Sequence, residues 1–280
     1  MRASLPAALL VSLALAGAAA AGTPGSSDIA ALQVGLAGRA LYAADVDGFA
    51  GPATIAGLKK LPGAGGPLEA ATRAALGTFG TAQLGDRPLV GGCRGWDVAE
   101  LQFLLAWHGF PSGRFDGVFG DRTTAALMRF QRWAGIDAIG VAGPATRAAL
   151  ADPPPTSPIR LWRPIDALPG DGFGPRADKF HPGVDYPAPM GTLVVAAGDG
   201  VVLGAGPVDG YGNLVVVQHA AGVTTMYAHL SKFLVEPGRR VSRGTPLGLV
   251  GSTGESTGPH LHFEVRVRDA AVDPATALYQ

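Results

Sequence analysis

The chain has 280 residues, and its 22 Lys and Arg are balanced by 22 Asp and Glu, so the formal net charge at pH 7 is zero. A surface that binds nucleic acid needs an excess of basic side chains, so this balance argues against nucleic acid as a partner. A hydrophobic fraction of 47% excludes general disorder. The single cysteine, Cys93, excludes an intramolecular disulfide framework and leaves the six histidines as the main source of metal ligands.

Residues 1–21 are typical of a signal peptide. A short basic start is followed by an apolar run over 5–16 and by three alanines at 19–21, which form a small-residue cleavage site. The pattern predicts an exported protein with no membrane association after cleavage. An uncleaved membrane anchor is the alternative.

An internal repeat predicts two small α-helical domains, each with three short helices. The Leu-Gln, Asp-Gly and Thr positions of residues 28–80 recur 69 residues later within residues 83–151. The first copy is degenerate, because it has Leu61-Pro62 where the second copy has Phe130-Gln131. Its ligand binding is therefore an open question, and a role as a structural spacer is the alternative.

The second copy allows more detailed expectations. Asp97 and Glu100 predict a capping box at the start of its first helix. His108 follows the last turn of that helix, where we expect a surface histidine near the negative helix terminus. Trp107 and Trp133 are expected in the core rather than as platforms for sugar rings.

The order of motifs in residues 92–150 is Leu-Gln, Asp-Gly-x-Phe-Gly-x-x-Thr, Phe-Gln and Gly-x-x-Thr. It resembles the three-helix peptidoglycan-binding domain found in many enzymes of the cell wall. The resemblance implies peptidoglycan as a partner of this part of the chain.

Residues 152–159 are rich in proline, which favours an extended linker. We expect the helical repeats to act through it as a tether that leaves the chemistry of the following domain unchanged; a repeat region that covers and inhibits that domain is the alternative. After the linker, residues 160–280 predict an antiparallel all-β domain, because short β-rich runs alternate with Gly and Pro turns. The expected strands are 193–197, 200–203, 214–219, 223–229, 246–250 and 261–267.

Four histidines and an aspartate in the β domain are candidates for chemistry. Two histidines and a carboxylate suit a catalytic zinc site with one open position, and His181 and Asp185 would combine with either His260 or His262. The two remaining histidines, one of them His229, would then serve proton transfer. On a strand His260 and His262 face the same side, so both can enter one groove. Scattered structural histidines are the alternative.

The order and spacing of these residues, together with Gly254-x-x-Thr257-Gly258-Pro259, resemble the lysostaphin-type zinc endopeptidases of the M23 family. The similarity runs from Phe173 to Pro274. It implies an antiparallel β fold and one Zn2+ per catalytic domain. The implied site consists of three ligands, His181, Asp185 and His262, and two catalytic histidines, His229 and His260, whose roles as base and as oxyanion or water partner stay interchangeable. His219 matches a family position outside this set, so we expect a structural role for it.

The resemblance therefore implies a secreted zinc metalloendopeptidase that hydrolyses peptide bonds in peptidoglycan stems or cross-links. Its partners would be the glycan and the stem peptides, at the cell wall or in the periplasm of a double-membrane envelope. The alternative is a non-catalytic wall-binding protein or hydrolase activator that uses the same groove. The complete set of five residues favours the enzyme, and the bond that is cleaved stays open.

Overall fold

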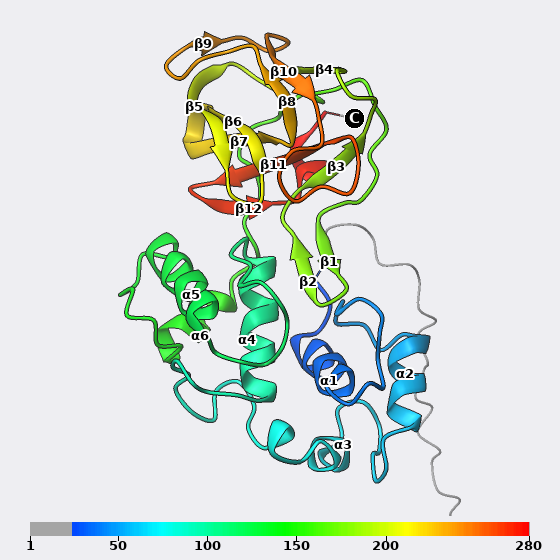
Figure 1. Ribbon diagram of the computed structural model, residues 1–280. Helices are drawn as coiled ribbons and strands as arrows, with labels where there is room; N and C mark the ends of the chain where they lie inside the picture. The colour runs from blue at the N-terminus through cyan, green and yellow to red at the C-terminus, as the bar shows by residue number, and fades with distance from the viewer. Residues whose placement is uncertain (1–23, 280) are drawn as a thin grey trace, which may run out of the picture.

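The computed structural model describes residues 24–279, so the predicted signal peptide lies outside the described residues. A helical region comes first and a β region follows (Figure 1). Of the helices within residues 24–279, none combines the length and apolar character needed to span a bilayer.

Each copy of the repeat forms three helices, as predicted. The first copy contains α1 (Ser27–Ala37), α2 (Pro52–Lys59) and α3 (Ala70–Ala75), followed by the short 3-10 turn η1 (Gly77–Gly80). The second contains α4 (Trp96–Trp107), α5 (Asp121–Trp133) and α6 (Pro144–Leu150).

Helix α4 lies at the centre of the helical region and is buried on all sides. Phe103 and Trp107 belong to a core shared with Leu32 and Leu36 of α1, whereas Leu101 belongs to the core of the second copy. A helix that is hydrophobic all round is a buried helix. The two copies are therefore packed against each other through α4.

The repeated Leu-Gln, Asp-Gly and Thr positions form a buried hydrogen-bond network. The side-chain amide of Gln102 donates to the Asp116 carboxylate at 2.9 Å and to the Thr123 hydroxyl at 3.3 Å, and its carbonyl accepts from Gly117 N–H at 2.9 Å. Gln33 makes the corresponding bonds in the first copy. A buried amide needs such partners, so the motif has a structural cause.

The two copies differ where the sequence differs. Helix α2 has 8 residues and α5 has 13. Pro62 stands where Gln131 stands in the second copy, and a helix rarely continues into a proline. The longer helix α5 includes Gln131, whose side-chain amide donates to the Val141 carbonyl and to the Thr146 hydroxyl. These bonds form a third instance of the glutamine network.

The predicted capping box is wrong. The N-cap of α4 is Gly95, which has no side chain to cap with. Asp97 pairs instead with Arg87 at 2.7 Å, and Glu100 accepts a hydrogen bond from the backbone N–H of Leu84 at 2.6 Å. Both carboxylates hold the segment that precedes the helix.

The prediction of a surface His108 is also wrong, because its exposed fraction is only 2%. Its ring nitrogens lie 2.8 Å from the Leu104 carbonyl and 3.0 Å from the Asp152 carbonyl. The second contact comes from the start of the proline-rich segment, 44 residues away in sequence. The prediction that two tryptophans lie in the core agrees with the structure, because Trp107 is buried and Trp133 is partly buried.

The β region contains all six predicted strands and six more. The predicted ones are β4 (Leu193–Val195), β5 (Gly200–Val208), β6 (Gly212–Gln218), β7 (Val223–Ala228), β10 (Pro246–Val250) and β11 (His260–Val267). The additional ones are β1 (Gly174–Arg176), β2 (Lys179–His181), β3 (Val184–Pro187), β8 (Leu230–Phe233), β9 (Arg240–Val241) and β12 (Ala270–Val272). A 3-10 turn, η2 (Ala220–Gly222), precedes β7, and helix α7 (Pro274–Ala277) follows β12.

These strands form two sheets and a hairpin, all antiparallel. The larger sheet has the order β12-β11-β7-β6-β5-β9, with β3 also paired to β11; the smaller has the order β4-β10-β8. The main core of the region combines residues of both sheets, among them Phe263 and Tyr227 of the larger and Leu247 of the smaller. This core fixes the position of β11, and with it the side chains on the other face of that strand.

The β1–β2 hairpin reaches away from the sheets and packs on the helical region (Figure 1). Phe180 of β2 is buried in the core that contains α1 and α4. At the hairpin turn, the N–H of Val46 donates to the Ala177 carbonyl at 2.9 Å, and the N–H of Phe115 donates to the Asp178 carbonyl at 2.6 Å. The two regions are thus joined by more than a linker, which differs from the expected tether.

Candidate active site

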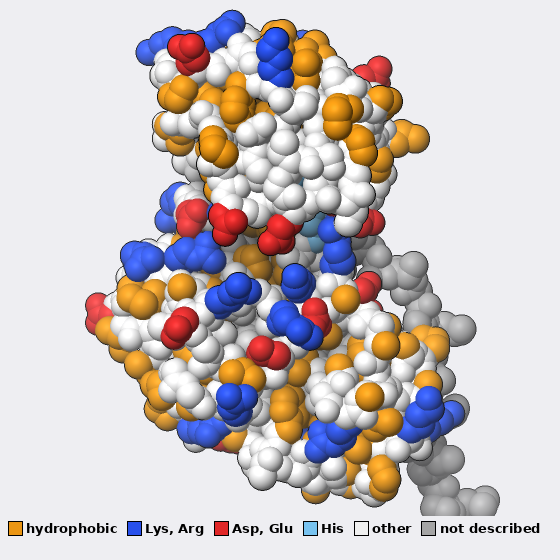
Figure 2. Space-filling model, viewed as in Figure 1, with side chains coloured by type: hydrophobic (Ala, Val, Ile, Leu, Met, Phe, Trp, Pro, Cys, Tyr) orange, Lys and Arg blue, Asp and Glu red, His pale blue; other side chains and the backbone are white. Residues whose placement is uncertain are grey.

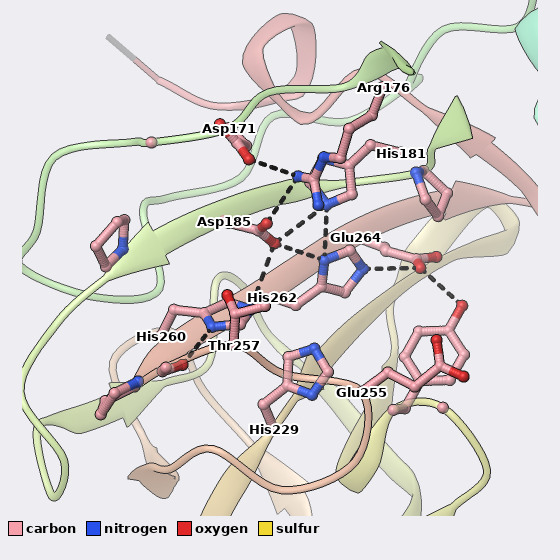
Figure 3. A pocket seen from close by; sticks show the side chains of 17 residues that line it. Asp171, Arg176, His181, Asp185, His229, Glu255, Thr257, His260, His262 and Glu264 are labelled. Carbon is pink, nitrogen blue, oxygen red and sulfur yellow. Dashed lines mark hydrogen bonds and ion pairs between the residues drawn. The ribbon is translucent and has the colours of Figure 1, made fainter. Parts of the chain in front are cut away.

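A cavity of about 610 Å3 in the β region holds all five of the predicted site residues (Figure 3). They come from β2, β3, the β7–β8 junction and β11. The histidine colour is visible at the waist of the molecule, where the β region meets the helical region (Figure 2). The structure therefore gathers residues that lie up to 81 positions apart in the sequence.

The turn between β2 and β3 sets the spacing of His181 and Asp185. It contains Gly183, where a Cβ atom would collide with the carbonyl oxygen of Phe263. The missing side chain allows this turn to approach β11 closely. Strand β3 then pairs with β11 in a register that places Asp185 opposite His262.

Strand β11 carries two histidines on one face, as the alternation argument predicts. His260 and His262 line the cavity, whereas Leu261 and Phe263 are fully buried in the core on the other face. This is the period-two geometry of a strand.

Three inward-facing acceptor atoms meet in the cavity. His181 Nδ1 donates to the Gly172 carbonyl at 2.7 Å, and His262 Nε2 donates to the Glu264 carboxylate at 3.0 Å. A neutral imidazole has one proton, so the other nitrogen of each ring carries a lone pair. Those nitrogens lie 3.0 Å apart, and Asp185 Oδ1 lies 3.1 Å from the first and 2.8 Å from the second. A cation shared by these atoms, either a proton or a metal ion, would stabilise the cluster.

The cluster fits zinc. His181, Asp185 and His262 each offer one ligand atom, and all three atoms lie within 4.8 Å of one another. Neighbouring ligands of a tetrahedral zinc are about 3.3 Å apart when the metal–ligand bonds are 2.0–2.1 Å long. Two imidazoles and one carboxylate leave the fourth position open, which is the arrangement of catalytic rather than structural zinc.

The same geometry shifts the pKa values of the cluster. Burial alone would raise the pKa of Asp185, but hydrogen bonds from His181 and His262 lower it below its usual range. Burial alone would lower the pKa of His262, but hydrogen bonds to Asp185 and Glu264 raise it to about 9. A proton therefore competes with a metal ion for this centre.

His229 has a left-handed backbone, with φ of 61°. It is the residue between β7 of the larger sheet and β8 of the smaller one, so the chain changes sheets at this point. Its N–H donates to the Tyr211 carbonyl at 2.9 Å, and its Nδ1 donates to the Thr253 carbonyl at 2.7 Å. Burial lowers the pKa of His229, so the ring is neutral at pH 7 with its lone pair on Nε2.

His260 is oriented in the same way. Its Nδ1 lies 2.8 Å from the Gly258 carbonyl and donates to it, which leaves the lone pair on Nε2. That nitrogen lies 3.8 Å from Asp185 Oδ1. The rings of His229 and His260 have centroids 4.7 Å apart, so two imidazoles flank the cluster.

The cavity contains charged residues to which the sequence reasoning gave no role. Arg176 donates to Asp185 Oδ2 at 2.9 Å and pairs with Asp171 at 3.1 Å, and Glu255 lies in the loop before β11. Arg176 and Glu264 both fall within the segment that resembles the M23 family. Glu264 could have been identified from the sequence, because a residue two positions after His262 on a strand faces the same side as His262.

His219 lies outside this cavity, as expected. Its ring nitrogens contact the Asp199 carbonyl at 2.8 Å and the Thr225 hydroxyl at 2.7 Å. These bonds connect it to Tyr227 in the core, which is a structural role.

Two family models match the chain. Residues 179–274 match Peptidase family M23, and residues 94–150 match a peptidoglycan binding domain. The chain therefore contains an M23 peptidase domain preceded by a peptidoglycan-binding domain. The first model spans the strands that carry the cavity, and the second spans the second copy of the repeat.

Curated relatives match the same β region. The chain is 51% identical over 98 residues to the DD-carboxypeptidase/endopeptidase Mpg of Neisseria meningitidis serogroup B, and 48% identical over 97 residues to the peptidoglycan DD-endopeptidase ShyA of Vibrio cholerae. Each match covers 35% of this chain and 23% of the relative. The chain thus spans less than a quarter of the length of these relatives.

Among solved structures, the catalytic domain of lysostaphin from Staphylococcus simulans is similar to this chain. The identity is 36%, over 39% of this chain and 90% of that domain, with a TM-score of 0.38.

Proposed function

We propose that this chain is a zinc-dependent endopeptidase that hydrolyses peptide bonds in peptidoglycan. The observation that carries the proposal is the convergence of three potential ligand atoms, from His181, Asp185 and His262, in a cavity flanked by two further histidines. A purely structural site would fill the fourth position with a protein ligand. The open position is what a hydrolytic site requires.

The proposed bond is a cross-link between two D-amino acids. ShyA is named a peptidoglycan DD-endopeptidase and Mpg a DD-carboxypeptidase/endopeptidase, and their similarity to this chain lies in the β region that contains the cavity. We extend that specificity to this chain as part of the proposal.

One zinc ion would be held by His181 Nε2, Asp185 Oδ1 and His262 Nδ1. When bound, zinc supplies Lewis acidity that polarises the scissile carbonyl and acidifies water. The three side chains contribute by holding these three ligand atoms close to one another. Arg176 holds the second oxygen of Asp185, so that carboxylate is fixed in orientation.

The two flanking histidines would accept and orient the protons of the attacking water. His260 Nε2, the closer of the two to the Asp185 oxygen, accepts the proton of the attacking water and returns it to the leaving amine. His229 carries its lone pair on Nε2, because its Nδ1–H is engaged by Thr253. In this tautomer it accepts a hydrogen bond from the water and orients it, rather than donating to an oxyanion.

The second copy of the repeat would bind the wall polymer. Its match to a peptidoglycan-binding domain supports peptidoglycan as the partner and a location in the cell envelope. The stretch 1–21 has the composition of an export signal, which supports the same location.

The experiment that tests this function combines zinc content with product analysis. The purified chain is expected to contain one zinc ion and to convert a cross-linked muropeptide dimer into two monomers, as seen by mass spectrometry. Chelation should abolish the conversion, and added zinc should restore it. Zinc-loaded protein that binds sacculi but leaves every muropeptide intact would instead establish a non-catalytic binding protein.

A further inference from the structure

Glu264 lies behind His262, on the side of the ring opposite the proposed metal centre. Its side chain has no exposed surface, and its Oε1 lies 3.0 Å from His262 Nε2 (Figure 3). Both residues belong to β11 and point to the same face of that strand, because they are two positions apart.

The Glu264 carboxylate is held in place by two further donors. Arg266 Nε donates to Oε2 at 2.7 Å, and the Tyr211 hydroxyl donates to Oε1 at 2.8 Å. Arg266 also donates to the Tyr211 oxygen at 3.1 Å and to Asp269 at 3.2 Å. Each oxygen of Glu264 is therefore hydrogen-bonded, and the carboxylate has one orientation.

From this network we infer that Glu264 is a positioning residue for the metal site, which rests on the proposed zinc function. By accepting the Nε2 proton of His262, Glu264 fixes the tautomer that leaves the Nδ1 lone pair facing Asp185 and His181. Without an acceptor behind the ring, the proton can move to Nδ1 and the ring can rotate. Carboxylates that hold a ligating histidine in this way typically change metal affinity by about 10- to 100-fold.

The ion pair itself adds little to the stability of the fold. Burying a Glu–Arg pair costs desolvation that offsets most of its attraction, and apolar replacements of both partners are often neutral. The effect on the stability of the fold can therefore be separated from the effect on the position of His262. Removing the whole pair should leave the sheet intact and weaken only the hold on His262.

The test compares the affinity of the full chain for zinc in three variants. The paired change Glu264→Leu with Arg266→Leu removes the acceptor without leaving an unpaired charge, and we expect zinc to bind about 10- to 100-fold more weakly. Glu264→Gln keeps an acceptor oxygen but loses the negative charge that holds the Nε2 proton, so it should weaken zinc binding by a smaller factor that is still more than about two-fold. Asp269→Asn, which alters only the outer partner of Arg266, is the matched control and should leave the affinity unchanged.

Two further readouts separate positioning from general damage. Thermal melts of the metal-free proteins should agree, which shows that the fold is retained. Nitrogen NMR of the zinc-loaded wild type should show His262 bound through Nδ1 with a proton on Nε2, and the paired variant should lose that single signature.

Zinc affinity within about two-fold of wild type in the paired variant, with the same His262 signature, would overturn the inference while the proposed function stands. A wild-type chain that binds no zinc would overturn the proposed function itself. If the paired variant fails to fold, Glu264→Gln decides the question, since an unchanged affinity and an unchanged His262 signature would reject the inference.

Discussion

The indole of Trp107 packs edge-on against the ring of Phe180, with centroids 5.3 Å apart and planes at 76°. Trp107 ends helix α4, and Phe180 is the residue directly before His181. Phe173 completes the contact, 4.9 Å from the Phe180 ring. The strand that supplies the first ligand of the proposed metal site is thus anchored in the helical region.

Removing the helical region should therefore affect the chemistry and not only the binding of sacculi. A protein that begins at residue 160 leaves Phe173 and Phe180 without their partners, so the β1–β2 hairpin loosens and His181 loses its fixed position. We expect weaker zinc binding and slower cleavage of a small soluble muropeptide than in the full chain. Both are measured side by side with the full chain at saturating zinc.

The expected tether gives a different result in the same experiment. Equal rates on the small peptide, with slower cleavage of sacculi alone, would restore the tether model. Faster cleavage of the small peptide would mean that the helical region covers the groove.

Single substitutions at the cavity should separate the ligands from the proton carriers. His181→Ala, Asp185→Ala and His262→Ala should each lose zinc and activity together. His260→Ala should keep zinc and lose at least about 100-fold in turnover, the scale of a positioned acid–base group. Metal content by mass spectrometry and turnover on one muropeptide check both statements. Zinc loss in His260→Ala with retention in His262→Ala would reverse the assignment of the two residues.

Glu100 should make the stability of the helical region depend on pH. Burial, with further contributions from Asp28 and Asp97, raises its pKa to about 8. A carboxyl whose pKa is raised by folding stabilises the fold fully below its unfolded pKa, near 4.5, and that contribution is lost as the pH rises towards 8. The upper limit is about 1.4 kcal/mol for each pH unit in this window.

Glu100→Gln tests this dependence. Glutamine can still accept the Leu84 hydrogen bond but cannot ionise. Denaturant unfolding between pH 4 and pH 9 should show that the variant gains stability relative to wild type as the pH rises. Parallel curves for the two proteins would contradict the prediction.

The left-handed backbone of His229 should make two inactive variants differ in thermal stability. His229→Gly and His229→Ala both remove the imidazole and should lose turnover to the same extent, at least about 100-fold. Glycine accepts a φ of 61° without strain, whereas alanine does so at a cost of about 1 kcal/mol. We expect the glycine variant to melt at the higher temperature. Equal melting temperatures would indicate that this turn imposes no strain.

The features that the sequence predicted are those that local patterns determine. The alternation at 260–263 predicted which residues face the cavity and which face the core. The long apolar strands β5, β6 and β7 were found from composition and turn spacing. The repeat predicted six helices, because each copy carries its own apolar positions and turns.

The features that it missed depend on distant partners. His108 is buried because the Asp152 carbonyl completes its hydrogen bonds from 44 residues away. Strands β1 and β2 have three residues each, too short to show a period, and Phe180 finds its partners on α4. Glu100 looked like a capping residue because it follows Asp97 by three positions, but its carboxylate accepts from Leu84, 16 residues earlier in the sequence.

The glutamine network at Gln33 and Gln102 bears on how such repeats are recognised in other chains. Each amide ties the loop that follows its helix, through the same set of acceptors, whether or not the copy around it keeps its longer helix. A search for these sequence positions finds chains that can form this loop. It gives no information about the ligands that the surfaces of those chains bind. In the first copy the closed loop contributes Asp45 and Val46, which hold Ala177 at the tip of the β1–β2 hairpin. The first copy thus retains this glutamine network while its loop packs against the β region.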